Sequence, residues 1–160
     1  MPVQNELMQD IDGRCNCLAA RKASRYLTAV YDQALSPANL RATQFSILYR
    51  LIRGGPLTIG DLAAAMAMDR TTLSTNLKPL EREGLLEMVP GQDRRVKNVV
   101  ITDAGVARYR EAFPLWQAVQ QEFEGHYGEK RAAALRSSLR NVLHSGFSPW
   151  AEGDGTPAKD

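Results

Sequence analysis

The sequence predicts a mainly helical α+β fold that carries one small β-hairpin. Most of the chain places apolar residues at helical spacing, whereas residues 85–102 alternate like two strands around a polar turn. The chain has 160 residues, of which 44% are hydrophobic and 24% charged. This composition fits one compact domain with a modest core.

Charge, hydropathy and cysteine content argue against several classes of protein. The net charge of +2 is too small to indicate nucleic acid by itself, so any basic surface must come from local clustering. No apolar run reaches the roughly 18 residues of a membrane span, and the acidic N-terminus lacks a signal-peptide pattern. We therefore expect a soluble, cytoplasmic protein without membrane contact. Cys15 and Cys17 would point about 200° apart on a helix, so we expect no disulfide between them.

The first half of the chain predicts three helices in succession. After a flexible start at residues 1–12, apolar spacing predicts helices at 15–35 and 43–53, each ended by a proline-containing turn. Thr58, with Asp61 three residues later, has the spacing of a capping box at the start of the short helix TIGDLAAAMAM.

The second half predicts a further helix at 69–83, ended by Gly84, and then the hairpin. The strands LLEMV and VKNVVIT flank the turn PGQDRR. A long helix is expected from residue 102 to about 125, with a kink at Pro114, followed by a last helix at 129–143. Residues 148–160 are expected to form a mostly disordered tail, in which Trp150 is the one candidate to dock on the domain. We expect no internal repeat.

The helix at 69–83 has two distinct faces. Its leucines lie within one narrow sector, and the opposite side, which lacks a carboxylate, carries Thr71, Thr75, Lys78 and Arg82, with Ser74 beside them. A short helix, a tight turn and a second helix with such a face form a helix-turn-helix, whose second helix enters the major groove of DNA.

The hairpin adds a cationic tip to this helix. Arg94, Arg95 and Lys97 lie within four residues and can bind a DNA backbone or enter a minor groove. We expect the Asp93 carboxylate to orient Arg95. An ordinary surface helix and an ordinary turn would explain either feature alone, but both in this order favour DNA binding.

The run TIGDLAAAMAMDRTTLSTNLKPLEREGLL, followed by DRRVKNVVITDAG, resembles the winged helix-turn-helix core of the MarR family of transcriptional regulators. The most specific part is the wing pattern, in which Ile101 replaces a more common leucine. Its residues are Asp93, Arg95, Val99, Ile101, Thr102 and Gly105. The resemblance extends over nearly the whole chain. It implies a winged helix-turn-helix at about 41–102, flanked by dimerisation helices at about 13–35 and 103–146 within a single domain at 13–147.

The resemblance also implies a function and its residues. It implies a homodimer that binds pseudo-palindromic double-stranded operator DNA, usually as a repressor, and responds to a small effector. The implied DNA contacts are Arg70, Thr71, Thr72, Ser74, Thr75, Asn76, Lys78, Arg94 and Arg95; the charge pattern adds Arg82, Asp93 and Lys97. Apolar residues on the terminal helices independently support dimerisation.

Two kinds of switch remain open. The spacing from Cys17 to Tyr31 is similar to the first helix of the hydroperoxide-sensing branch of the family, although Arg21 replaces one tyrosine of that branch. A neighbouring cation stabilises a thiolate, but a cysteine is also often a small buried hydrophobe. The other switch, which the family resemblance suggests, is a small aromatic or anionic ligand bound between the dimerisation helices and the DNA-binding part. The candidate lining residues, each of which has an ordinary core role as its alternative, are Tyr31, Phe45, Tyr49, Met66, Met68 and Trp116.

Other functional classes fit the sequence less well. It contains no phosphate-binding glycine loop and no nucleophile elbow, and its two histidines, His126 and His144, lack metal-ligand partners at helical spacing. We therefore expect no enzyme, no cofactor and no metal site. A winged-helix module that binds another protein is the remaining rival.

Overall fold

The computed structural model of the protein describes residues 10–146. The expected tail at 148–160, Trp150 and nearly all of the expected flexible N-terminus lie outside the described residues. The elements, in chain order, are α2 (Ile11–Arg14), α3 (Asn16–Leu35), the 3-10 helix η1 (Ser36–Ala38), α4 (Ala42–Gly54), β1 (Leu57–Thr58), α5 (Ile59–Ala65), α6 (Arg70–Arg82), β2 (Leu86–Pro90), β3 (Lys97–Ile101), α7 (Asp103–Tyr127) and α8 (Glu129–Leu143). The predicted mainly helical fold with a small antiparallel sheet is confirmed.

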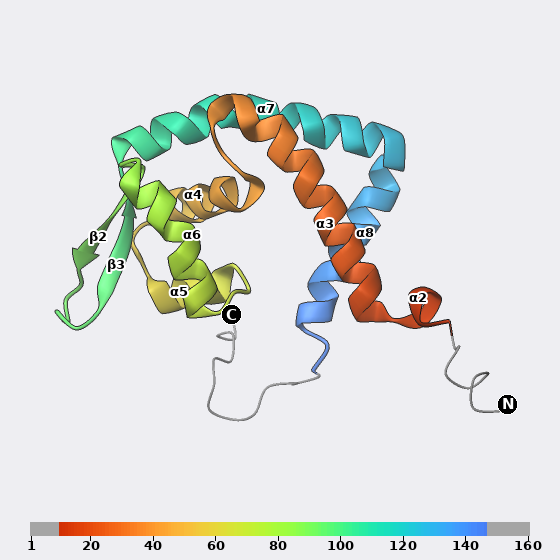
Figure 1. Ribbon diagram of the computed structural model, residues 1–160, viewed down its shortest axis with the longest axis horizontal. Helices are drawn as coiled ribbons and strands as arrows, with labels where there is room; N and C mark the ends of the chain where they lie inside the picture. Colours follow the sequence, from red (N-terminus) through yellow and green to blue (C-terminus); the bar gives the residue numbers. More distant parts are fainter. Residues whose placement is uncertain (1–9, 147–160) are drawn as a thin grey trace, which may run out of the picture.

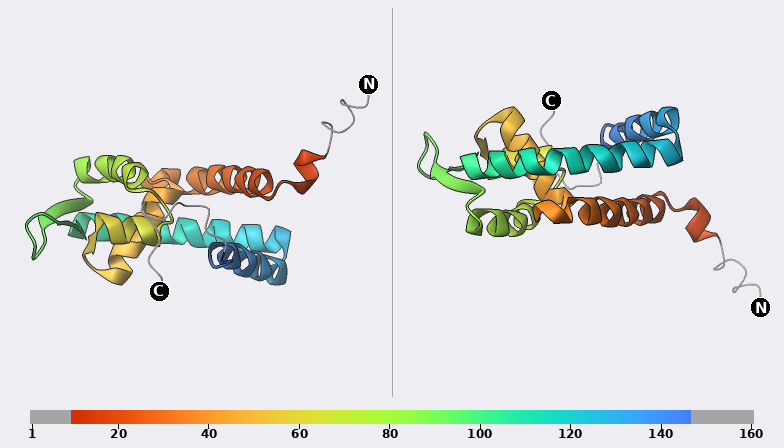
Figure 2. Two further views of the ribbon diagram at one scale, coloured as in Figure 1. Left: turned by 90° about the horizontal axis from the view of Figure 1, so that it is seen from below. Right: turned by 90° about the horizontal axis from the view of Figure 1, so that it is seen from above.

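The long helix α7 joins two differently built ends of the molecule (Figure 1). At its start lies the winged end, formed by α4, β1, α5, α6, β2 and β3. At its other end, α3, α8 and the second half of α7 form what we call the helical arm. The views from below and above show α3 running alongside α7 (Figure 2), and the two helices are in contact.

The hairpin belongs to a three-stranded sheet with the order β1-β3-β2. The β2 and β3 strands pair antiparallel from Leu86 opposite Ile101 to Pro90 opposite Lys97. The sequence did not predict β1, whose two residues pair with Asn98 and Val99 of β3. This short strand ties the start of α5 to the base of the wing.

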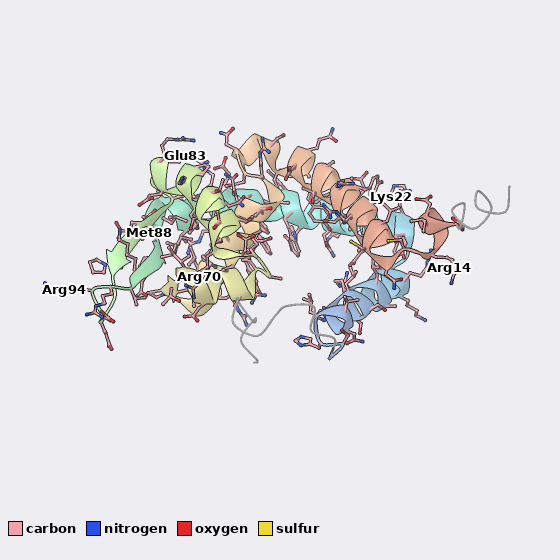
Figure 3. All side chains as sticks on the ribbon, turned by 60° about the horizontal axis from the view of Figure 1, so that its bottom comes forward. Arg14, Lys22, Arg70, Glu83, Met88 and Arg94 are labelled. Carbon is pink, nitrogen blue, oxygen red and sulfur yellow. The ribbon has the colours of Figure 1, made fainter. Side chains whose placement is uncertain are left out.

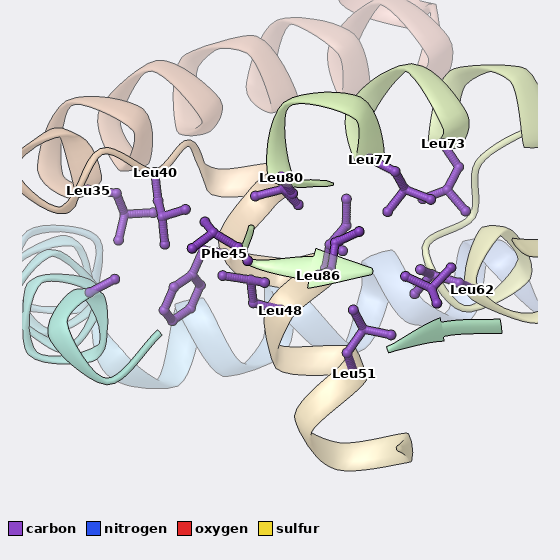
Figure 4. Close-up of a cluster of buried hydrophobic side chains, with 14 of the residues drawn as sticks. Leu35, Leu40, Phe45, Leu48, Leu51, Leu62, Leu73, Leu77, Leu80 and Leu86 are labelled. Atoms are coloured by element: carbon purple, nitrogen blue, oxygen red, sulfur yellow. The ribbon is translucent and has the colours of Figure 1, made fainter. Parts of the chain in front are cut away.

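Leucine side chains fill the core of the winged end (Figure 4). Leu48 of α4, Leu62 of α5 and Leu77 of α6 are each at most 1% exposed. Leu86 of β2 closes this cluster from the sheet side, and α7 adds the fully buried Ala112. Burial of apolar surface in this cluster therefore holds α6 against the other elements of the winged end.

The N-terminal region differs from the expected simple helix. Residues 11–14 form the separate turn α2, which is capped by the Asp10 side chain and begins inside the stretch expected to be flexible, residues 1–12. Cys15 is not helical: its φ of −80° and ψ of 107° are extended, and its Sγ accepts a hydrogen bond from the Leu18 N–H. The prediction of no Cys15–Cys17 bridge assumed that both residues lie on one helix, and this assumption is wrong for Cys15. Both thiols are free in the structure.

Candidate nucleic-acid interface

Helix α6 begins at a side-chain cap. The Asp69 carboxylate accepts hydrogen bonds from the Thr72 hydroxyl (2.6 Å) and from the Thr72 backbone N–H (2.8 Å). The hydroxyl bond, followed by the backbone bond, lowers the pKa of Asp69. The cap therefore fixes where α6 starts, directly after the turn that follows α5.

The polar side of α6 is exposed, as the amphipathic pattern predicts. Thr71, Thr75, Lys78 and Arg82 are exposed, whereas Ser74 is half-buried. On the opposite side, three leucines are at most 1% exposed; they are Leu73, Leu77 and Leu80. The helix thus presents hydroxyl and cationic groups outward while its leucines hold it on the core.

Several hydrogen-bond donors on this face are already engaged within the helix. The Thr75 hydroxyl donates to the Thr71 carbonyl at 3.1 Å, and the Asn76 amide donates to the Thr72 carbonyl at 2.9 Å. The Thr72 hydroxyl donates to Asp69. These contacts follow the local side-chain-to-backbone pattern of Thr and Asn in helices. A base edge that takes the Thr72 or Thr75 hydroxyl as its donor must therefore displace an existing bond, whereas the Asn76 amide keeps a second N–H.

The wing tip is a tight, exposed turn. Gly91 N–H donates to the Val96 carbonyl at 2.8 Å, and Val96 N–H donates to the Asp93 carbonyl at 2.9 Å. The Asp93 side chain accepts the Arg95 backbone N–H at 3.0 Å. Asp93 therefore fixes the backbone that carries Arg95, and the structure shows no ion pair between this carboxylate and the guanidinium. Arg94 lies at the far end of the hairpin (Figure 3).

The cations of α6 and the wing have no carboxylate partner within residues 10–146. The ion pairs found there join Lys22 to Asp12, Arg108 to Glu83 and Arg136 to Glu124. The cations outside these pairs include Arg70, Lys78, Arg82, Arg94, Arg95 and Lys97. Unpaired, exposed cations keep their full attraction for a polyanion such as the DNA backbone.

A joint at the start of α7 connects α6 to the wing. The Thr102 hydroxyl donates to the Gly84 carbonyl at 2.6 Å and accepts from Gly105 N–H at 3.1 Å. Gly105 is buried, and a Cβ on it would lie 2.0 Å from the Leu85 carbonyl oxygen. The Arg108 guanidinium also contacts Glu83 at 3.2 Å. The end of α6, the base of the wing and the start of α7 are thus fixed together.

The ligand and redox candidates are distributed over several places. Cys17 and Arg21 are exposed on α3. Tyr31 is half-buried and donates a hydrogen bond to Gln120, which in turn contacts Glu124. Burial, and then the charge of Glu124, raise the pKa of Tyr31. Met66 packs on the core at the end of α5. The structure does not bring these residues into one site.

An aromatic array connects two further candidates. Phe45 stacks on Tyr109 with ring centroids 4.9 Å apart and on Trp116 at 6.0 Å. Tyr49 stacks on Tyr109 at 6.5 Å. Burial, and then Tyr49, raise the pKa of Tyr109. Tyr49 and Trp116 therefore belong to one aromatic stack, and this stack packs α4 against α7.

A groove of about 590 Å³ runs between α3 and α7 in the helical arm. Its lining is mostly apolar, with Val30 from α3 and Leu115, Val119 and Phe123 from α7. These are the helices that the sequence predicts for dimerisation. None of the predicted ligand and redox residues lines this groove.

Residues 10–146 offer neither a metal site nor a membrane-spanning helix. No group of three or more His, Cys, Asp and Glu side chains there is arranged to hold a metal ion. In the same range, no helix is long and apolar enough to cross a membrane.

Comparisons with known proteins agree with this architecture. The model of the MarR family matches residues 38–95. The M. tuberculosis transcriptional regulator MosR, solved in complex with DNA, is 35% identical with a TM-score of 0.73. The match covers 82% of this chain and 98% of that one.

Two other relatives carry functional descriptions. The transcriptional repressor NicR of Pseudomonas putida is 27% identical over 126 residues, which cover 78% of this chain and 80% of NicR. Bordetella bronchiseptica BpsR, solved in work on regulation of its DNA binding by 6-hydroxynicotinic acid, is 25% identical with a TM-score of 0.71. That match covers 81% of this chain and 93% of the BpsR chain.

Proposed function

This chain belongs to the MarR family of DNA-binding transcriptional regulators, and we propose that it is a homodimeric repressor released from its operator by a small ligand. The DNA-binding part of this proposal depends on one observation: the exposed cations on α6 and the wing have no carboxylate partner among the described residues 10–146. Such a set favours a DNA partner over a protein partner, because proteins offer a continuous row of negative charge far less often.

We assign the DNA contacts to two groups. Thr71, Ser74, Thr75 and Asn76 have short polar side chains on α6 that suit base edges in the major groove. Longer cations are the expected phosphate contacts, and Thr72 and Asp93 support the backbone around them. These cations are Lys78, Arg82, Arg94, Arg95 and Lys97. The winged end, at about 41–102, is thus the proposed DNA-binding unit.

Dimerisation is supported by exposed apolar surface in the helical arm. The groove between α3 and α7 is unfilled in one chain. On α8, Leu139 is 47% exposed and Val142 and Leu143 are each 67% exposed. A second copy that covers these faces would place two winged ends on half-sites about 34 Å apart on a pseudo-palindromic operator.

The repressor and effector roles are supported by relatives. NicR is described as a repressor, and the DNA binding of BpsR is regulated by 6-hydroxynicotinic acid. An aromatic or anionic effector of the present protein is proposed on that basis, without an assigned pocket.

The test has a binding arm and a ligand arm. Wild-type protein is offered a pool of duplexes with a randomised 24-bp centre, as roughly two turns of DNA suffice for two half-sites. We expect enrichment of a pseudo-palindrome, with affinity that falls steeply as salt rises. A thermal-shift screen of aromatic acids then seeks a compound that raises the melting temperature and releases that duplex. Failure to enrich any duplex would contradict DNA reading by this protein.

The exposure of Cys17 supports one second candidate, a thiol-based oxidant response. An exposed thiol is open to peroxide, unlike the buried cysteine of the alternative interpretation, and Arg21 follows one helical turn later. The Cys17→Ser variant is compared with the wild type for release of the enriched duplex by peroxide. Equal release of both proteins removes the cysteine from the mechanism.

A further inference from the structure

Arg70, the first residue of α6, turns its side chain back over α5. A Cβ built on Gly60 of α5 would lie 3.1 Å from Nη2 of Arg70 and 3.6 Å from both Cζ and Nε. Three atoms of the guanidinium group therefore lie against the bare backbone of Gly60. Figure 3 labels Arg70 where α6 starts beside α5.

The carboxylates nearest in sequence do not neutralise this guanidinium. Asp69 is engaged with Thr72 as the cap of α6. The Asp61 carboxylate accepts the Thr58 hydroxyl at 2.8 Å at the start of α5. Among residues 10–146, no carboxylate lies within ion-pair distance of Arg70. The guanidinium is held in place by packing and keeps its charge available.

The position of Arg70 decides which part of a DNA duplex it meets. In a helix-turn-helix, the second helix enters the major groove while the first helix crosses the sugar-phosphate backbone. A guanidinium that lies on the first helix, here α5, therefore faces phosphates. To read guanine with both of its terminal nitrogens, an arginine must extend into the groove, and Arg70 would have to leave Gly60 to do so.

We propose that Arg70 binds a DNA phosphate beside α5 and reads no base, and that Gly60 is the positioning residue that makes this placement possible. The inference rests on the proposed DNA-binding function and changes the role of Arg70 within it. Family resemblance alone grouped Arg70 with the recognition residues.

Gly60 offers a direct way to move the guanidinium without breaking the fold. Its φ does not lie in the left-handed region, and the nearest atoms to an added Cβ belong to the flexible end of Arg70. Alanine is also favourable inside a helix. Gly60→Ala should therefore leave the melting temperature near that of the wild type and push the guanidinium a few tenths of an ångström away from the α5 backbone.

The experiment uses the full chain and the randomised duplex pool. Wild type, Arg70→Ala, Gly60→Ala and the double variant are each taken through selection and then titrated against the enriched duplex at several salt concentrations. Arg110→Ala, which removes an exposed cation from α7, is the matched charge control.

For Arg70→Ala we expect affinity to fall roughly fivefold to tenfold on every duplex, with an unchanged enriched sequence and a salt slope smaller by about one per protomer. Gly60→Ala should weaken binding less, and should have no further effect when residue 70 is already alanine. Arg110→Ala should match the wild type.

Two results would overturn the assignment. If Arg70→Ala relaxes the preference at a particular base pair, Arg70 reads a base. If Gly60→Ala weakens binding equally with and without the Arg70 side chain, Gly60 acts through another contact. A wild-type protein that enriches no duplex contradicts the proposed function instead, so the two failures are distinguishable.

Discussion

Two glycines show how single residues control the approach of one element to another in the winged end. At Gly60, the missing Cβ leaves room for a side chain from the next helix; at Gly105, it leaves room for the Leu85 carbonyl. Gly105 appeared in the sequence only as part of a family pattern. Its reason is tertiary, because Leu85 approaches it from 20 residues earlier in the chain, and no local periodicity reports such a contact.

Gly105→Ala should destabilise the protein strongly. The new Cβ would lie 2.0 Å from a backbone oxygen that cannot rotate away. We expect a loss of about 3 kcal/mol in the free energy of unfolding, or a fall in melting temperature of roughly 6–12 °C. Thermal unfolding followed by circular dichroism measures it. Gly125→Ala is the control, because its Cβ would meet nothing within 4 Å; equal melting temperatures of the two variants would disprove the packing argument.

Asp69 makes stability depend on pH. In the folded protein, the hydrogen bonds to Thr72 lower the pKa of Asp69 from 3.8. The contribution of this carboxylate to the free energy of unfolding is therefore fully present above pH 3.8 and is lost as pH falls through the lowered pKa. The wild type should therefore melt above Asp69→Ala at neutral pH, and the difference should shrink in acid. Thermal scans from about pH 6 to pH 2.5 test this. A difference that stays constant over that range would exclude the carboxylate as its source.

At the scale of elements, the helices were predictable because each has its own start and stop residues. The helix expected at 69–83 is Arg70–Arg82 in the structure, with Asp69 and Glu83 as its caps. The strand β1 was not predictable, since two residues show no period and their partner in β3 lies about 40 residues away. The placement of Arg70 on α5 was not predictable either, because it depends on a contact between two helices. The hydrogen bonds of the Thr side chains within α6 were predictable in principle, because they join residues three or four positions apart.

The wing should contribute electrostatically to DNA binding. Arg95→Ala removes an exposed cation whose backbone remains held by Asp93. We expect weaker binding to all duplexes and a salt slope reduced by about one per protomer, because one phosphate contact is lost. Fluorescence anisotropy at several salt concentrations measures both quantities. Unchanged affinity near 0.15 M salt, where the Debye length is about 8 Å, would show that the wing does not contact DNA.

At the scale of the whole molecule, the two ends of the chain differ in what they leave exposed. The winged end exposes cations over a leucine core, whereas the helical arm exposes apolar side chains and a groove. The sequence indicated this division through the surplus of apolar residues on its terminal helices. It could not indicate which residues form the groove, because that depends on how α3 lies against α7.

Val142→Glu should disrupt the proposed dimer while leaving the protomer folded. Val142 is 67% exposed, so a charge there has little effect on a single chain but would be buried between two copies. We expect the mass in solution to fall from twice 17.7 kDa to 17.7 kDa, measured by analytical ultracentrifugation. Ile52→Glu, at an exposed position on α4, is the control and should remain dimeric. A wild-type protein that sediments as a monomer at DNA-binding concentrations would contradict the dimer.

Pro79 lies inside α6 and divides it into two parts. Because proline has no N–H, the helix lacks one hydrogen bond, the one to the Thr75 carbonyl. The proposed base-reading residues precede this break, and the residues that join α6 to the wing and α7 follow it. Substitutions in the first part can therefore change which operator is preferred with little effect on the joint. In evolutionary terms, relatives of this protein can acquire new target genes by changing one short segment of the chain while the scaffold stays the same.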